Sequence, residues 1–308
     1  MRIVSFFSSA TELLYALGLG RCVVGRSEHC DYPASVRQKP VIVRSRVRSA
    51  HLSSRGIEEA VQQLRRRSEH QYRIDVALLK RLKPDLVVTQ ELCSVCAASH
   101  PEVGEAIHRL PQVPRLVSVS GRNFAQCLDA VRILGRETGH QRQADFLIRR
   151  MERSIQTIQH RLKKVSERPR VWCAEWLDPL MVAGHWTPDM VAMAGGIDGL
   201  GRAAQDSRRV SWEVVRQYDP EVIVVMPCSF SIARTVRESP LLSQLPGWSN
   251  LKAVKAHRVF AVNGAFFHRS GPRLLTGLKI MAALFHPGRF PKPLVSHARK
   301  LPSLEFEG

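Results

Sequence analysis

The residues best suited to chemistry include a closely spaced pair of thiols. Cys93 and Cys96 form a C-x-x-C motif, and two thiols at this spacing can bind a transition metal or exchange a disulfide. A structural zinc site normally adds a second Cys or His pair at regular spacing. The pair therefore has three interpretations: a metal site that also uses a loop residue such as His185, a redox centre, or thiols packed in a loop.

A second candidate site is the run from residue 175 to residue 188, which reads EWLDPLMVAGHWTP. It contains two carboxylates, two indoles and an imidazole, from Glu175, Asp178, Trp176, Trp186 and His185. A strand is expected just before it, at residues 170–173. A helix is expected to begin at residues 187–189, where a hydroxyl N-cap, a proline and an acid follow in order. The loop between them would lie at the carboxyl edge of an open α/β sheet, where ligands bind. The two tryptophans either contact such a ligand or close the top of a core.

The elements that would position these residues repeat along the chain. A strand at residues 2–6 leads to a helix that begins in a capping box at residues 9–12 and stops at a glycine. Residues 75–89 align without a gap with residues 211–225, and each copy has an N-cap residue, a short helix, a proline turn and a β-branched strand. The strand, helix and glycine plan also recurs at residues 170–196. Two similar α/β lobes are therefore expected.

One long amphipathic helix is expected between the lobes. From residue 141 to residue 165, apolar residues recur at a three-four spacing and Arg, Lys and Gln fill the other faces. A helix of this length spans ~37 Å and would form a rigid connection. The predicted fold class is α/β, with two small lobes joined by one long helix. Its parts are an N-terminal lobe at residues 1–122, the long connecting helix at 123–167, a C-terminal lobe at 168–287 and a poorly ordered basic tail at 288–308.

Composition limits the classes of function. The chain has 308 residues and 44% apolar content, enough to bury a core. Its net charge of +19 is dispersed and no recognised nucleic-acid module accompanies it, so we expect no specific nucleic-acid partner. No apolar run reaches the ~18 residues of a membrane helix, and the first residues do not read as a signal peptide. Seven cysteines without a disulfide framework favour free thiols. We therefore expect a monomeric protein of the cytosol.

Several motifs resemble those of the helical-backbone substrate-binding proteins of ABC importers. They are SSATELLYALG at residues 8–18, CDYP at 30–33, KPDLVV at 83–88, DPEVIV at 219–224 and the stretch from PGW at 246–248 to RVF at 258–260. This family serves cobalamin, ferric siderophores and haem, and the cobalamin-binding branch is the most similar. The similarity runs over residues 2 to about 287. It implies a non-catalytic receptor that binds a small molecule in a cleft between its lobes and can deliver it to an importer permease.

The chain departs from the family at its start. Transport receptors of the family carry a secretion signal, and the first residues of this sequence do not read as one. The resemblance therefore predicts handling or salvage of a ligand in the cytosol. A periplasmic location is expected only if the true start lies upstream.

The resemblance also predicts the contacts of the ligand. Flat side chains of both lobes suit a planar corrin ring, and they come from Tyr32, Trp176, Trp186, Phe266 and Phe267. Glu175 and Asp178 would accept hydrogen bonds from peripheral amides, and His185 is a candidate axial ligand of cobalt. The full predicted set is Ser8, Ser9, Glu28, Tyr32, Arg46, Glu91, Glu175, Trp176, Asp178, His185, Trp186, Phe266 and Phe267.

Two other functions remain open. A cytosolic transition-metal protein or metalloenzyme would use the soft ligands of the same loops, which are His29, Cys30, Cys93, Cys96, His185, Cys228 and His268. A ferric-siderophore or haem receptor would pair arginines such as Arg46 and Arg269 with anionic groups of its ligand.

Overall fold

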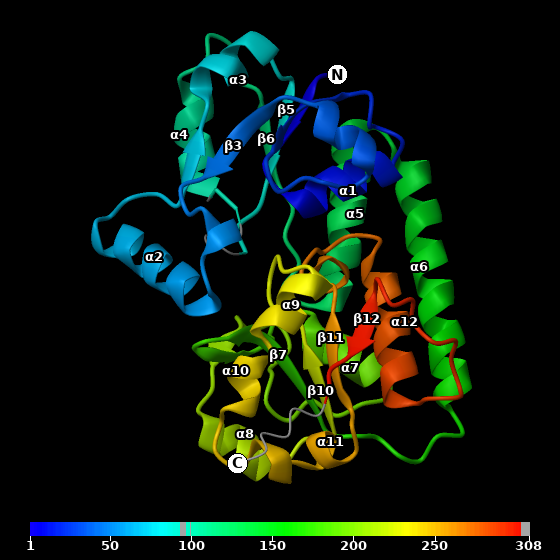
Figure 1. The fold of residues 1–308 in the computed structure, drawn as a ribbon. Helices are drawn as coiled ribbons and strands as arrows, with labels where there is room; N and C mark the ends of the chain where they lie inside the picture. The colour runs from blue at the N-terminus through cyan, green and yellow to red at the C-terminus, as the bar shows by residue number, and fades with distance from the viewer. Residues whose placement is uncertain (93–96, 99, 303–308) are drawn as a thin grey trace. The chain divides into compact units, whose positions relative to one another are not determined.

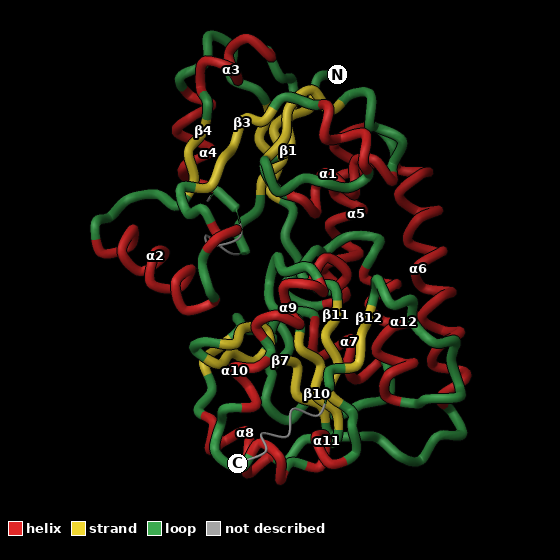
Figure 2. Tube along the Cα trace, in the orientation of Figure 1, coloured by secondary structure: helices red, strands yellow, loops and turns green. Residues whose placement is uncertain are grey.

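The chain folds into two compact α/β units. The structure, a computed structural model, describes residues 1–92, 97–98 and 100–302. Unit 1 comprises Met1–Leu52, Gly56–Gly121 and Ala125–Arg150, and unit 2 comprises Ser53–Arg55, Arg122–Phe124 and the described residues from Met151 onward. Each unit has one six-stranded sheet with helices packed beside it (Figures 1 and 2). The prediction of two α/β lobes is confirmed.

The sheet of unit 1 has the strand order β4-β3-β2-β1-β5-β6. Its strands are β1 (Ile3–Ser5), β2 (Val23–Ser27), β3 (Val41–Ser45), β4 (Tyr72–Ile74), β5 (Leu86–Thr89) and β6 (Arg115–Ser118). Neighbouring strands run parallel except β3 and β4. The helices of this part of the chain are α1 (Ser8–Ala16), α2 (Ser54–Arg66), α3 (Val76–Leu82), α4 (His100–His108) and α5 (Phe124–Thr138). Strands β1 and β5 are buried along their length, as expected for parallel strands covered on both faces.

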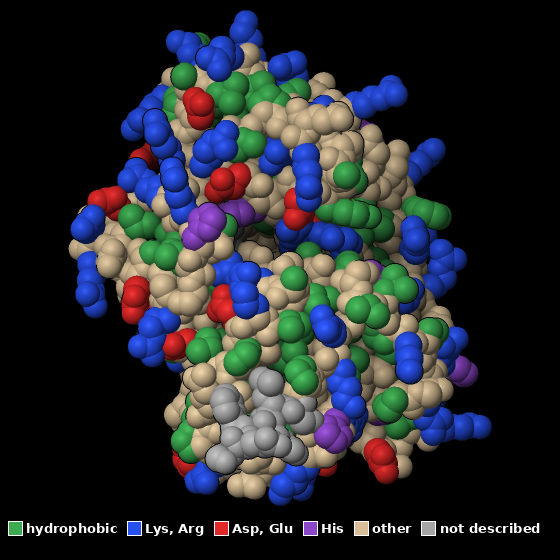
Figure 3. Space-filling model, viewed as in Figure 1, with side chains coloured by type: hydrophobic (Ala, Val, Ile, Leu, Met, Phe, Trp, Pro, Cys, Tyr) green, Lys and Arg blue, Asp and Glu red, His purple; other side chains and the backbone are tan. Residues whose placement is uncertain are grey.

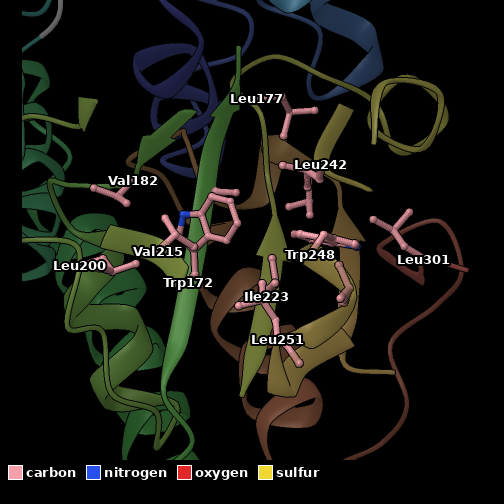
Figure 4. Packing of buried hydrophobic residues seen from close by; sticks show 14 of the residues in the cluster. Trp172, Leu177, Val182, Leu200, Val215, Ile223, Leu242, Trp248, Leu251 and Leu301 are labelled. Carbon is pink, nitrogen blue, oxygen red and sulfur yellow. The ribbon is translucent and has the colours of Figure 1, made fainter. Parts of the chain in front are cut away.

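The sheet of unit 2 has the order β12-β11-β10-β7-β8-β9. Its strands are β7 (Val171–Leu177), β8 (Leu180–Val182), β9 (Arg208–Arg209), β10 (Val222–Val225), β11 (Val259–Val262) and β12 (Ala298–Lys300). Its helices are α7 (Thr187–Met193), α8 (Trp212–Tyr218), α9 (Ile232–Glu238), α10 (Pro240–Ser243), α11 (Lys252–Lys255) and α12 (Leu274–Phe285). Trp172 lies fully buried among aliphatic side chains of this core, which extends to Trp248 and Leu301 (Figure 4).

The internal match of the sequence corresponds to a repeated structure. Asp75 caps α3 by accepting a hydrogen bond from the Leu78 amide, and Ser211 caps α8 by accepting one from the Val214 amide. Both helices end in a left-handed residue, Lys83 at φ 43° and Asp219 at φ 47°. The acid after each proline accepts a hydrogen bond from the backbone amide just before the first strand of its unit. Asp85 Oδ2 accepts from Arg2 N, before β1, at 2.7 Å, and Glu221 Oε2 accepts from Arg170 N, before β7, at 2.9 Å.

Two predicted helix caps are wrong. Helix α1 begins at Ser8 after Phe7, and no side chain caps it. The expected box at residues 9–12 does not form because the helix begins one residue earlier, so Ser9 lies inside it. Ser8 Oγ donates to the His29 carbonyl and Thr11 Oγ1 to Ser5 Oγ. Helix α7 begins at Thr187 as expected, but no side chain caps it either.

The tail beyond Gly288 is ordered as far as the structure describes it. Strand β12 pairs antiparallel with β11, with Lys300 opposite Phe260 and Ala298 opposite Val262. Leu301 is 7% exposed and belongs to the core of unit 2. The expectation of a poorly ordered tail is therefore wrong for residues up to 302, because this segment completes the edge of the sheet beside β11.

The segment assigned to one connecting helix contains two. Helix α5 ends at Thr138, and α6 runs from Gln141 to Leu162 over 22 residues. Gly139, with φ 72°, separates them, since a left-handed residue ends a helix most readily when it is glycine. At 1.5 Å per residue α6 is about 33 Å long. Its residues up to Arg150 belong to unit 1 and those from Met151 belong to unit 2.

Candidate functional site

A polar cluster surrounds Glu175 near the carboxyl end of β7. Glu175 accepts a hydrogen bond from Ser207 Oγ, and that oxygen accepts one from the Gly184 amide at 3.1 Å. The Nε2 atom of His268 is bonded to the Met226 carbonyl, which can only accept, so Nε2 carries a proton. The Nδ1 atom of His268 lies 3.8 Å from Glu175 Oε1. This carboxylate, hydroxyl and imidazole form one connected group with little exposed area.

His185 lies beside this cluster with its backbone in the left-handed region, at φ 52°. Its amide donates to the Gln205 carbonyl at 2.6 Å, and its Nδ1 atom is buried without a hydrogen-bond partner 3.9 Å from Asp206 Oδ1. Burial lowers the pKa of the His185 imidazole, although Glu175 and Asp206 act in the opposite direction. The ring is therefore neutral at neutral pH.

Trp176 and Asp178 bind the start of α2. The indole Nε1 of Trp176 donates to the Ser54 carbonyl at 3.2 Å and to the Asp178 carbonyl at 3.1 Å. Asp178 Oδ2 pairs with Arg55 Nε at 2.8 Å. Since Ser54 and Arg55 belong to unit 2, these contacts lie within that unit. The sequence reasoning placed Glu175 and Trp176 in a loop, but both lie in β7, which is longer than predicted because it forms a hairpin with β8.

Three residues that the sequence reasoning missed complete this contact. The Phe230 ring lies 5.2 Å from the Trp176 ring, and the guanidinium carbon of Arg234 lies 3.7 Å from the centre of Phe230. Arg234 Nε binds Glu238 Oε1 at 3.1 Å, and Glu238 Oε2 accepts from the Ser54 amide at 2.9 Å. The four-residue spacing of Arg234 and Glu238 predicts their pairing on a helix. The bond to Ser54 joins residues 184 positions apart and has no local signal.

The other predicted aromatic contacts of unit 2 lie in its core. Trp186, Phe266 and Phe267 are 5%, 8% and 0% exposed. The Trp186 indole donates to the Phe267 carbonyl at 2.7 Å, so its polar atom is satisfied inside the protein. Trp186 thus occupies the position that the core interpretation of the sequence describes.

The predicted residues of unit 1 lie around the ends of β1, β2, β3 and β5. Tyr32 is 48% exposed, whereas Ser9 is buried and lies on α1. The Glu28 carboxylate accepts from the Ser45 amide, and Arg46 pairs with Glu69 at 3.0 Å. Glu91 is an exposed side chain 3.7 Å from His100 Nε2.

Arg26 holds the loop that carries Tyr32. Its guanidinium is buried and donates to the carbonyls of Ser27, Glu28 and Arg37 at 3.1 to 3.3 Å. These bonds connect the end of β2 to a short 3-10 turn, Ala34–Gln38. Arg26 therefore positions the loop that carries Tyr32.

The described residues provide no metal site. Among them, no three His, Cys, Asp or Glu side chains converge in a way that could hold an ion. Cys93 and Cys96, the predicted metal pair, lie outside the described residues. Cys22, Cys30, Cys127, Cys173 and Cys228 are free thiols. Burial raises the pKa of Cys173 well above its usual value, with a further contribution from Asp198, so this thiol is unreactive.

The chain matches proteins of one family along most of its length. The periplasmic binding protein family matches residues 3–264. An ABC transporter substrate-binding lipoprotein of Bacillus subtilis, YvrC, is 26% identical over 293 residues, covering 94% of this chain and 81% of the relative. The vitamin B12-binding protein of Vibrio cholerae is 24% identical over 290 residues, covering 90% of this chain and 86% of the relative. A solved periplasmic haem-binding protein of Pseudomonas aeruginosa has a TM-score of 0.72 at 19% identity and covers 96% of each chain. This last likeness shows a shared fold.

These similarities correct the expected location. One relative is a lipoprotein and the structural neighbour is periplasmic, so both act outside the cytoplasm. The prediction of a cytosolic protein, which depended on the first residues of the sequence, is therefore wrong. Within the described residues, no helix has the length and apolar character needed to cross a membrane.

Proposed function

Because the chain belongs to the periplasmic binding protein family, we propose that it binds cobalamin or a related corrinoid and presents it to the permease of an ABC importer. The general activity of the family is the binding of a substrate, without catalysis. The proposal concerns the ligand and the residues that contact it. The similarity to the vitamin B12-binding protein of Vibrio cholerae over 90% of the chain supports a corrinoid.

The observation that carries the choice of ligand is the polar cluster around Glu175. It combines a carboxylate, the Ser207 hydroxyl and the His268 imidazole near the end of β7. The rim of a corrin bears amides, whose N–H groups donate to carboxylates such as that of Glu175. Haem bears carboxylates instead, and Glu175 would repel them at short range. The cluster therefore suits an amide-rich ligand.

The proposed contacts in unit 1 are made by the loop after β2. Tyr32 offers an exposed ring, and Arg26 fixes the loop through three carbonyl groups. A rigid aromatic side chain contributes apolar contact to a planar ligand with little loss of rotamer entropy. We propose the same role in unit 2 for the partly exposed ring of Trp176.

The test is a calorimetric and optical titration of the purified full chain with aquocobalamin and with cobinamide. We expect a saturable one-to-one isotherm for at least one of them. The variant Glu175→Gln keeps the size of the side chain but removes its charge, and hydrogen bonds to charged groups contribute about 1.5–3 kcal/mol. Its affinity should therefore fall roughly 10- to 100-fold. Trp176→Ala should weaken binding as well, and Val214→Ala, on an exposed position of α8, should not.

Two outcomes would reject the corrinoid. One is the absence of binding at tens of micromolar of either corrinoid. The other is a saturable isotherm with haemin or a ferric chelate that is tighter than any corrinoid isotherm, which would assign the chain to another ligand class of the same family. Metal analysis of the purified chain and of a Cys93→Ser, Cys96→Ser variant tests the transition-metal alternative directly.

A further inference from the structure

A loop of unit 2 combines strongly exposed apolar side chains with basic ones. Residues 286–297 connect α12 to β12, and Leu294 and Val295 within them are 63% and 74% exposed. These values exceed those of the other exposed large hydrophobic side chains in the described part of the chain. Two adjacent aliphatic side chains at a loop tip favour neither solubility nor the packing of unit 2, so they indicate a contact outside the chain.

The tip is held by the residues that follow it. The Leu294 carbonyl accepts from the amides of His297 and Ala298 at 2.8 and 3.0 Å. The His297 ring lies 4.7 Å from the Phe266 ring, and the His297 carbonyl accepts from the Asn263 amide at 3.1 Å. The loop therefore presents Leu294 and Val295 from an ordered turn that is attached to the sheet.

Basic side chains surround the same loop. Arg289 and Lys292 are exposed within it. The guanidinium carbon of Arg161, near the end of α6, lies 5.8 Å from the centre of the Phe290 ring, and the loop runs beside this end of α6 in Figure 1. Burial lowers the pKa of the His286 imidazole, and the charges of Arg168 and Arg289 lower it further. Figure 3 shows blue Lys and Arg side chains beside the lower end of α6.

We name this region the basic loop surface. It comprises Leu294 and Val295, the two exposed cations of the same loop, Arg289 and Lys292, and Arg161 beside Phe290. None of these cations forms an ion pair with a carboxylate in the described part of the chain. Residues 161–168 contain one acid, Glu167. Burial lowers the pKa of Arg258, although the charge of Glu167 acts in the opposite direction. The sequence from residue 286 to residue 304 contains no Asp or Glu.

We propose that the basic loop surface contacts an anionic lipid bilayer. Aliphatic side chains that insert at the boundary between headgroups and acyl chains, flanked by Lys and Arg that attract lipid phosphates, are the pattern of interfacial membrane contacts. A protein partner fits less well. Stable protein interfaces bury more than about 1,000 Å², whereas this surface has two protruding aliphatic side chains and three cations.

The contact is expected to be weak and reversible. Each Lys or Arg close to an anionic surface contributes about a fivefold increase in partitioning, and screening by salt reduces it. The two aliphatic side chains set the depth and the orientation. This inference is independent of the ligand, because none of its residues belongs to the proposed corrinoid contacts.

The test is co-sedimentation of the full chain, without corrinoid, with vesicles of phosphatidylcholine that contain about 30% phosphatidylglycerol. We expect binding at low salt that declines at about 300 mM salt, and little binding to pure phosphatidylcholine. Leu294→Ser with Val295→Ser should reduce the partition coefficient at least tenfold, and Arg289→Gln with Lys292→Gln should reduce it about 25-fold. The control for the aliphatic pair is the double variant Ile197→Ser, Val214→Ser. The control for the basic pair is the double variant Arg237→Gln, Lys255→Gln. All four residues are exposed elsewhere in unit 2.

Three results would overturn the proposal. The first is no sedimentation with the anionic vesicles at low salt, which would leave a protein as the partner of this loop. The second is equal binding by Leu294→Ser, Val295→Ser and its control pair. The third is binding to pure phosphatidylcholine as strong as binding to anionic vesicles. Circular dichroism and the thermal midpoint of each variant show that a lost contact is not lost folding.

Discussion

At the scale of single residues, Gly184 shows how closely two segments approach each other beside Glu175. A Cβ atom at this position would lie 2.7 Å from the Asp206 carbonyl carbon and 2.8 Å from the Ser207 amide nitrogen. Gly184→Ala therefore has to move the backbone that carries Ser207, and we expect a loss of about 1–3 kcal/mol in the free energy of unfolding. Urea denaturation measures it.

The matched control for this substitution is Gly104→Ala in α4, where no atom of the described residues lies within 4 Å of the added carbon. Alanine is the better helix former by about 0.5–1 kcal/mol, so this variant should be slightly more stable than the natural chain. Equal effects of the two substitutions would show that residues 205–207 do not press against Gly184 in solution.

His185 leads to a prediction about pH. Burial lowers the pKa of its imidazole below the usual value near 6.5. As pH falls through 6.5, the unfolded chain binds a proton at this ring that the native ring does not, so the ring's contribution to stability decreases until the lower native pKa is reached. Between pH 7.5 and 5.5 the natural chain should lose stability relative to His185→Asn, with a slope of at most about 1.4 kcal/mol per pH unit.

Asparagine is the suitable replacement at this position because it tolerates the left-handed backbone that His185 adopts. Urea unfolding of both proteins across this pH range gives the difference. An NMR titration that found the His185 pKa above 6.5, or identical pH profiles of the two proteins, would contradict the prediction.

At the scale of elements, the two repeated helices differ from α1 in how they begin. Asp75 and Ser211 each accept a hydrogen bond from an amide of the first turn, whereas no side chain caps α1. Asp75→Ala and Ser211→Ala should therefore each lower the unfolding free energy by about 1 kcal/mol. Ser9→Ala, which the sequence pattern marks as an equal loss, should cost less than either, because the Ser9 side chain does not cap α1. Chemical denaturation measures the unfolding free energy of the three variants. A loss at Ser9 as large as the losses at Asp75 and Ser211 would support the predicted capping box of α1 and contradict the structure.

The elements that the sequence predicted well depend on local signals. The caps at Asp75 and Ser211 and the prolines after both helices act within a few residues, so the pattern alone locates α3, α8 and the strands after them. Strand β12 has no such signal, since it forms only because β11 offers an open edge. The hairpin of β7 and β8 was missed for a related reason: Asp178-Pro179 reads as the end of a strand, although here it is the turn between two.

The same contrast applies to the candidate site. The sequence singled out Glu175, Trp176 and His185 by their chemical types, and in the structure the charge of Glu175 acts on His185, which lies beside the polar cluster. The sequence alone could not separate buried rings from exposed ones. Trp186, for example, is buried where its indole binds the carbonyl of Phe267, 81 residues away. The role of Glu238 at the start of α2 depends on an equally distant contact.

At the scale of the whole molecule, the proposed ligand should stabilise both units at once. A ligand that binds only the native state stabilises it by RT ln(1 + [L]/Kd), about 2.7 kcal/mol at 100 times Kd. Amides that exchange through unfolding of a unit should then exchange about 100-fold more slowly in any unit that the ligand contacts. Because we propose contacts from Tyr32 in unit 1 and from Glu175 and Trp176 in unit 2, aquocobalamin should slow exchange in β1 and β5 and also in β7 and β10. Hydrogen exchange read by mass spectrometry resolves these strands, and Glu175→Gln at the same ligand concentration is the control, with weaker protection throughout. Protection confined to one unit would contradict the two-sided contact while leaving corrinoid binding in place, whereas protection of neither unit would remove both.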